Sequence, residues 1–131
     1  MNLFKTILKM LYIMKPIVEY NPDITQFFAH FLGEDLAAIT LYPYIFTSTE
    51  PIAANVLNHE KIHCEQYKEL LIIGFPIIML LNFLFNLIYY GDKNIAYRQT
   101  LFEREAYENM NNFNYLKHRR RYSWLWSKKI T

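Results

Sequence analysis

The residues best suited to chemistry are His59, Glu60 and His63, which form the pattern His-Glu-x-x-His in a segment that favours a helix. Residues four apart on an α-helix lie one turn apart on the same face, so both imidazoles can bind one Zn²⁺. Bound zinc acidifies a water molecule, and Glu60 lies beside the ion, where its carboxylate can accept the proton. The pattern predicts a zinc hydrolase. The alternative is that both histidines belong to an ordinary amphipathic helix.

A second helix is expected over residues 101–109, which are rich in helix-forming side chains and include two candidate third ligands, Glu103 and Glu105. Residues two apart on a helix point to different sides, so only one of these glutamates can face the histidines. The alternative is that both belong to a solvated acidic helix face.

At this point the sequence resembles the gluzincin metallopeptidases, in which a helix after His-Glu-x-x-His supplies a glutamate, often as Glu-x-x-Ala-Asp. The run Glu103-Arg104-Glu105-Ala106-Tyr107 matches this pattern with Tyr107 in place of the aspartate. The resemblance covers residues 56–66 and 101–109. It implies His59, His63 and Glu103 as zinc ligands, and Glu60 as the catalytic base of a peptidase acting on a peptide or protein substrate.

The substitution at Tyr107 matters because in such families the aspartate commonly supports a metal-binding histidine. A tyrosine can form hydrogen bonds but carries no carboxylate. Together with the small size of the chain, this departure favours an alternative function, a zincin-like metal-binding module without peptidase activity. Tyr97, Arg98 and Tyr107 are further candidates for oxyanion or supporting groups. Gln66, three residues beyond His63, can orient a ligand or a substrate amide.

Length and composition predict one domain over residues 1–131. The chain is 53% hydrophobic, which is ample material for a core. Its single cysteine, Cys64, cannot form an internal disulfide and is expected to be a buried, inert thiol. The predicted fold is mainly α: a zincin-like helical domain made of a motif helix, a folded-back apolar helix and a glutamate helix, with at most one short edge strand or hairpin.

The remaining elements follow from residue spacing and from helix-capping residues. Residues 2–15 are amphipathic and end at Pro16, and the next helix is expected to have Asp23 as its N-cap and to be closed by Gly33. His30, in that helix, is expected to be structural. Residues 36–47 are β-branched and aromatic, but Pro43 limits them to an edge strand. The expected helices cover residues 2–15, 24–32, 51–73 and 77–90, the third beginning at the Ser48-Thr49-Glu50-Pro51 sequence.

Residues 70–90 contain no charged side chain and are long enough to cross a bilayer. A straight span, however, would separate His63 from Glu103 by about 30 Å of hydrocarbon. We therefore expect the chain to bend at Gly74 and Pro76 and to return Glu103 to the histidines.

Three segments suit a membrane surface, namely residues 2–15, 70–90 and 117–131. The last of these combines lysine and arginine with Tyr122, Trp124 and Trp126, as headgroup regions favour. We do not expect a nucleic acid partner. No small-residue cleavage site follows the first helix, so no signal peptide is predicted, and the expected location is cytoplasmic or membrane-associated. A membrane-associated protein without enzymatic activity, in which the His-Glu-x-x-His is accidental, is the third interpretation.

Overall fold

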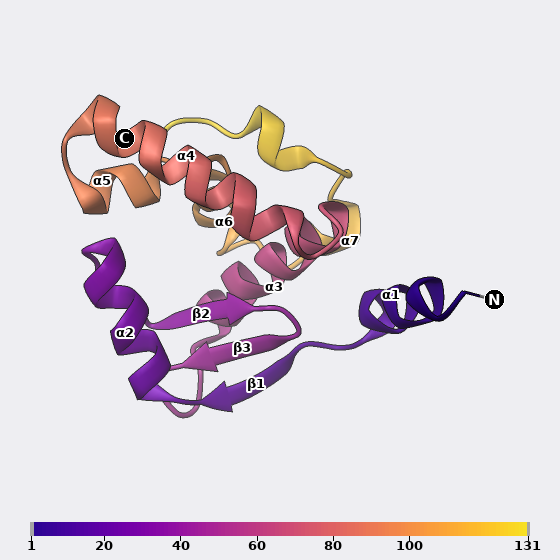
Figure 1. Cartoon of the computed structure of the whole chain (residues 1–131). Helices are drawn as coiled ribbons and strands as arrows, with labels where there is room; N and C mark the ends of the chain where they lie inside the picture. Colours follow the sequence, from indigo (N-terminus) through magenta and orange to yellow (C-terminus); the bar gives the residue numbers. More distant parts are fainter. Residues whose placement is uncertain (1, 131) are drawn as a thin grey trace.

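The computed structural model describes residues 2–130 and is mainly helical, as predicted, with one small sheet (Figure 1). Its elements in chain order are α1 (Leu3–Ile13), β1 (Ile17–Tyr20), α2 (Pro22–Leu32), β2 (Ala38–Leu41), β3 (Tyr44–Thr47), α3 (Ala54–Glu69), α4 (Gly74–Tyr90), α5 (Lys93–Arg98), α6 (Leu101–Asn109), α7 (Tyr115–His118) and a 3₁₀ turn, η1 (Ser123–Trp126).

The sheet has three strands in the order β1-β3-β2, so the expectation of at most one strand or hairpin was wrong. The hairpin of β2 and β3 lies inside residues 36–47, with Pro43 in its turn. The added strand, β1, pairs in parallel with β3, and the Ile17 N–H donates to the Pro43 carbonyl at 2.8 Å. All four residues of β1 are exposed, so no alternation of buried and exposed residues marks it in the sequence.

Two predicted helix starts differ from the observed ones. Asn21 rather than Asp23 caps α2, because its side-chain oxygen accepts the Ile24 N–H at 3.2 Å. The motif helix α3 begins at Ala54 rather than Pro51. The Ser48 hydroxyl, expected to cap α3, instead bonds the Ala37 carbonyl at 3.0 Å and closes the β-hairpin. A hydroxyl that is satisfied by the hairpin is not available to the helix.

The chain bends between α3 and α4 by 109°, close to the predicted place. The bend lies at residues 70–73, where Leu71 and Ile72 have left-handed backbone conformations, rather than at Gly74 and Pro76. Both of those residues stand in the first turn of α4, where a proline costs no helical hydrogen bond because first-turn N–H groups have no intrahelical partner.

Within residues 2–130 no single helix meets the length and hydropathy expected of a membrane span. The pair α3 and α4 meets them only when taken together across the bend.

A column of aromatic rings holds the helices around the bend. Tyr67 of α3 stacks on Phe75 at a centroid distance of 4.0 Å, Phe75 stacks on Phe102 of α6 at 4.5 Å, and Phe102 meets Trp124 edge to face at 5.0 Å. Phe102 is 1% exposed and Trp124 is buried. The column therefore places α6 beside α3 and docks part of the basic C-terminal segment on the core.

The two asparagines of the apolar helix α4 bind protein backbone. The Asn82 side-chain oxygen accepts the Leu101 N–H at 2.8 Å, at the first residue of α6, and Asn86 donates to the Ala96 carbonyl at 3.0 Å. Asn82 thus satisfies a backbone donor that α6 leaves free, since its own N-cap residue, Thr100, makes no side-chain cap. These bonds fix the start of the helix that carries Glu103.

Candidate metal centre

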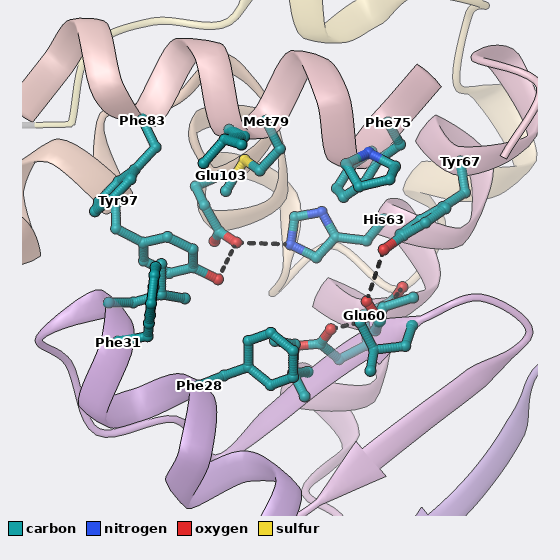
Figure 2. A pocket seen from close by; sticks show the side chains of 16 residues that line it. Phe28, Phe31, Glu60, His63, Tyr67, Phe75, Met79, Phe83, Tyr97 and Glu103 are labelled. Atoms are coloured by element: carbon teal, nitrogen blue, oxygen red, sulfur yellow. Dashed lines mark hydrogen bonds and ion pairs between the residues drawn. The ribbon is translucent and has the colours of Figure 1, made fainter. Parts of the chain in front are cut away.

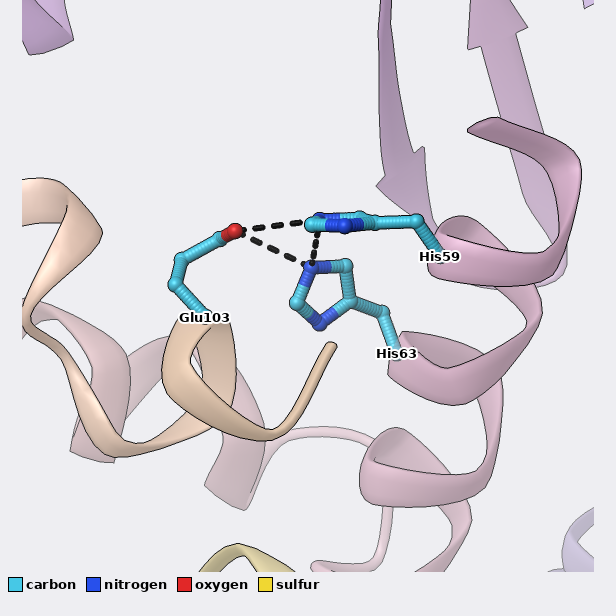
Figure 3. Close-up of side chains that lie close together, drawn as sticks. All are labelled: His59, His63 and Glu103. Atoms are coloured by element: carbon cyan, nitrogen blue, oxygen red, sulfur yellow. Dashed lines mark hydrogen bonds and ion pairs between the residues drawn. The ribbon is translucent and has the colours of Figure 1, made fainter. Parts of the chain in front are cut away.

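His59, His63 and Glu103 converge in the interior, as predicted (Figure 3). The two histidines come from successive turns of α3 and the glutamate from the first turn of α6. The His59 Nε2 lies 3.0 Å from Glu103 Oε2, the His63 Nε2 lies 3.0 Å from Glu103 Oε1, and the two Nε2 atoms are 3.1 Å apart. All three side chains are buried, so these contacts are shielded from solvent.

These separations fit a common metal ligand sphere. Ligand atoms about 2.0–2.1 Å from a tetrahedral zinc lie about 3.3 Å from one another, close to the three distances found here. Two imidazole nitrogens and one carboxylate are also a donor set that zinc binds, with a fourth position left for water or substrate. The cluster can therefore hold a metal ion.

The electrostatics of the metal-free cluster favour a protonated histidine beside an ionised glutamate. Burial alone lowers the pKa of His63, but the neighbouring Glu103 carboxylate outweighs it and raises that pKa to about 9. For Glu103 burial raises the pKa, yet the two histidines lower it well below its ordinary value. Each group thus stabilises the charged form of its neighbour, and a metal ion, which binds the neutral imidazole, would take the place of the proton.

A hydrogen-bonded chain fixes the ring of His63. Its Nδ1 lies 2.7 Å from the Gln66 side-chain oxygen, and the Gln66 amide nitrogen donates to Glu105 Oε2 at 2.7 Å and to the Phe102 carbonyl at 3.1 Å. Because the amide nitrogen is occupied by these acceptors, the amide oxygen faces the ring and Nδ1 carries the proton. The lone pair of Nε2 is then directed at the cluster.

Glu105, the other candidate for the third ligand, is connected to the site through Gln66, which bonds His63. Its two oxygens accept bonds from Gln66, from the Tyr115 hydroxyl at 2.8 Å and from the Arg119 guanidinium at 2.6 Å. Arg119 also bonds Glu69, at the end of α3, at 2.8 Å. The ambiguity between Glu103 and Glu105 is thereby resolved by geometry, since Glu105 points away from the histidines and into this buried network.

His59 is held differently. The ring of Tyr107, the residue that replaces the expected aspartate, packs edge to face on the His59 ring at a centroid distance of 4.6 Å. The Tyr107 hydroxyl instead donates to Glu34 at 3.3 Å, and the His59 Nδ1 is buried without a hydrogen-bond partner among the described residues. Tyr107 therefore restrains this histidine by packing and not through a hydrogen bond.

Tyr97 and Arg98, the other two predicted supporting residues, differ in whether they contact the cluster. The Tyr97 hydroxyl donates to Glu103 Oε1 at 2.6 Å, and burial together with Glu103 raises the pKa of Tyr97 well above its ordinary value, so it remains a donor. Arg98 lies outside the cluster, where its guanidinium pairs with Glu34 at 2.6 Å and stands over the Tyr107 ring. Tyr97 orients the Glu103 carboxylate. Arg98 contacts Glu34 and Tyr107, and the Tyr107 ring in turn packs on His59.

Glu60 is buried next to the histidines, and Thr40 of β2 holds it in place. The Thr40 hydroxyl donates to Glu60 Oε2 at 2.6 Å, and the Thr40 carbonyl accepts the Tyr67 hydroxyl at 3.1 Å. The other Glu60 oxygen forms no bond to Thr40. Glu60 lines both cavities that border the cluster.

The two cavities differ in chemistry. One, of about 210 Å³, lies between α2 and α4 and has aromatic and aliphatic walls over His63, Glu60 and Glu103 (Figure 2). The other also has a volume of about 210 Å³, and polar side chains, among them Glu34, His59 and Arg98, line it. Residues 34–41, which include β2, border one or the other cavity along this length, so the cluster lies between two openings beside one edge strand.

Sequence reasoning missed three residues that support the site, namely Thr40, Glu34 and Arg119. Each acts across a large sequence separation, as in the bond from Thr40 to Glu60. A buried Thr in a strand and an Arg in a basic tail carry no local signal for such contacts. Cys64, by contrast, is buried as predicted, and burial raises the pKa of its thiol to about 12.

Comparison of the chain with protein-family models, with curated proteins and with solved structures gave no match. The resemblance to the gluzincins thus stays a prediction, carried by residues 56–66 and 101–109.

Proposed function

We propose that the protein is a zinc-dependent metallopeptidase, with His59, His63 and Glu103 as the zinc ligands and Glu60 as the catalytic base. The observation that carries the proposal is the convergence of the two histidine Nε2 atoms and the Glu103 carboxylate, whose oxygens each lie 3.0 Å from one of these nitrogens, with Glu60 on the same cavity. The donor set leaves room for a fourth ligand, as in catalytic rather than structural zinc sites.

Zinc held by these ligands would supply an acidified water and a Lewis acid for a substrate carbonyl. Glu60 would accept the proton of the attacking water and deliver it to the leaving amine, which requires a well oriented carboxylate. The Thr40 hydroxyl donates to Glu60 Oε2 at 2.6 Å and so holds the carboxylate in one orientation. Tyr97 and Gln66 hold Glu103 and His63 in the ligand geometry.

The edge strand β2 suits a peptide substrate. It pairs only with β3 in the sheet, and its residues border the cavities on both sides of the cluster. An extended peptide that added to this edge would run past the metal, with main-chain hydrogen bonds providing affinity.

A second candidate function, a metal-binding module without peptidase activity, is favoured by one observation. His59 lacks the carboxylate partner expected from the gluzincin pattern, and its Nδ1 is buried without a partner among residues 2–130. A histidine without such a partner is a weaker ligand in a less defined orientation.

The two functions are separated by the variants Glu60→Gln and His63→Ala, compared with the wild type. Zinc per chain is measured by elemental analysis, and hydrolysis is measured on a fluorogenic peptide library. We expect Glu60→Gln to keep zinc and to lose about 10²- to 10⁴-fold in rate, because general base catalysis contributes about this much. His63→Ala is expected to lose zinc. Zinc binding without hydrolysis by the wild type establishes the second function, and equal rates for the wild type and Glu60→Gln end the catalytic one.

A further inference from the structure

The walls of the cavity between α2 and α4 are mostly apolar. Figure 2 shows Phe28 and Phe31 of α2 facing Met79 and Phe83 of α4, with His63 and Glu103 between them. The other polar residues that line it are Thr40, Glu60, Tyr67 and Tyr97. A cavity of about 210 Å³ whose α2 and α4 walls are apolar suits an aliphatic or aromatic group.

The mouth of this cavity is also apolar. Of the side chains that line the cavity, the well exposed ones are Phe31, Pro76 and Leu80, with Phe31 60% exposed. No charged residue stands among them. A group that enters the cavity must therefore pass an apolar rim. A group that already lies in an apolar phase has no desolvation cost at this step.

The rim continues over the outer faces of the same two helices. Phe27 lies one turn from Phe31 on α2, and α4 has no charged side chain along its whole length. Its exposed apolar side chains form a stripe beside the mouth, consisting of Ile77, Leu80, Leu81, Leu84, Phe85 and Ile88. We call this surface the α2–α4 face. A contiguous apolar surface with a ligand cavity at its centre marks an interaction site.

Lysines and exposed aromatic rings lie at the end of this face. Lys93 follows α4 directly and packs against Gly33, at the end of α2. The C-terminal segment lies against the end of α5, because the Gln99 side chain bonds the Ile130 carbonyl at 2.6 Å and its N–H at 3.2 Å. This segment adds Lys128, Lys129 and Trp126, which is 82% exposed.

The Asp92 carboxylate, next to Lys93, caps α5 by accepting the Ile95 N–H at 2.9 Å. The C-terminal segment, residues 117–130, carries six lysine and arginine residues and no acidic residue. An uncharged face bordered by cations and amphipathic rings complements an anionic lipid surface, where acyl chains lie beneath negative headgroups.

We propose that the α2–α4 face rests on an anionic membrane surface and that the cavity beside the metal cluster receives an apolar group of the substrate from that membrane. The claim about the substrate, the substrate half, rests on the proposed function. The claim about the membrane, the membrane half, does not. The substrate class is then a hydrophobic chain held in or at the bilayer, with the scissile bond next to the apolar group.

The membrane half is tested by flotation of the full chain with phosphatidylcholine vesicles, with and without phosphatidylserine. We expect binding that phosphatidylserine strengthens, and a loss of about tenfold or more in the double variant Leu81→Ser/Leu84→Ser, because each leucine leaves the apolar phase. The matched control is Ile17→Ser/Val18→Ser on β1, which lies at the far edge from α4 in Figure 1.

Three outcomes would overturn the membrane half. The first is the absence of binding to either vesicle type, and the second is an equal loss in the control variant. The third is self-association that the double variant abolishes without any vesicle binding, which would assign the α2–α4 face to a second copy of the chain.

The substrate half is tested with two zinc-chelating probes, acetohydroxamate and octanohydroxamate, on the zinc-loaded chain. Octanohydroxamate should bind at least about tenfold more tightly than acetohydroxamate, because each buried methylene increases the affinity several-fold. Phe31→Ser, at the exposed mouth, should remove most of that advantage and leave acetohydroxamate unchanged. Equal affinity of both probes refutes the apolar cavity. Binding of neither refutes the metal site and with it this half, while the vesicle result stands.

Discussion

The hydrogen-bonded chain behind His63 gives the sharpest prediction, which concerns Gln66→Met. Gln66 is 0% exposed, and its side chain forms three bonds, with His63, Glu105 and the Phe102 carbonyl. Methionine has nearly the same length and fits the space, but it neither accepts the His63 Nδ1–H well nor donates to Glu105. The substitution therefore removes the support of one ligand without emptying the core.

The magnitude follows from the groups left behind. A buried N–H without a partner costs about 1–3 kcal/mol, whereas Glu105 keeps Arg119 and Tyr115 and loses less. Loss of a residue that orients a metal ligand weakens metal binding by about 10- to 100-fold. At a fixed excess of zinc, that reduction removes about 1.4–2.7 kcal/mol of zinc-dependent stabilisation.

Two measurements check this prediction. Zinc affinity is determined by competition with a chelating dye, and the free energy of unfolding is determined in urea with and without zinc. The control is Cys64→Ser, a buried residue of α3 that is not one of the three residues of the cluster. If Gln66→Met binds zinc as tightly as the wild type, the reasoning about His63 orientation is refuted. If Cys64→Ser lowers the zinc affinity as much as Gln66→Met does, the loss of affinity reflects general destabilisation of the fold.

Three more predictions follow from the structure. Thr40→Val removes the hydroxyl that holds Glu60, so the variant should keep zinc and lose about tenfold or more in peptidase rate; an unchanged rate would contradict this role. Arg119→Met removes the guanidinium that pairs with the buried Glu69 and Glu105 side chains, so urea unfolding should show a loss of about 3–5 kcal/mol, and a loss under 1 kcal/mol would contradict this network. The Cys64 thiol should resist alkylation in the native chain at pH 8. Because its pKa is about 12 when folded against 9 in the unfolded chain, its contribution to stability is complete below pH 9 and is lost as the pH rises toward 12; rapid native-state labelling would contradict this burial.

The histidine pair was predictable because it depends only on helix periodicity, which the local sequence carries. The choice of Glu103 over Glu105 needed the resemblance to a known pattern as well as the helix geometry. Gln66 could be suspected from its position three residues after His63, but its acceptors, Glu105 and the Phe102 carbonyl, lie on another helix. Their identity depends on how α3 and α6 pack.

The elements that were mispredicted share a physical cause. Strand β1 is wholly exposed, so hydrophobic patterning did not reveal it, and the parallel partner that makes it a strand is β3, after α2 and β2 in the chain. Ser48 has the residue type of a helix cap but is satisfied by the hairpin. Thr40 and Glu34 owe their roles to contacts across more than one element. Local propensity was overridden at each place by a hydrogen bond between distant segments.

The double contact of Arg119, with Glu69 at the end of α3 and with Glu105 on α6, ties the two helices that carry the cluster to one guanidinium late in the sequence. Arg119 follows both histidines, Glu103 and both of its own carboxylate partners in the chain. The spacing between α3 and α6 therefore depends on a segment that supplies none of the three residues of the cluster.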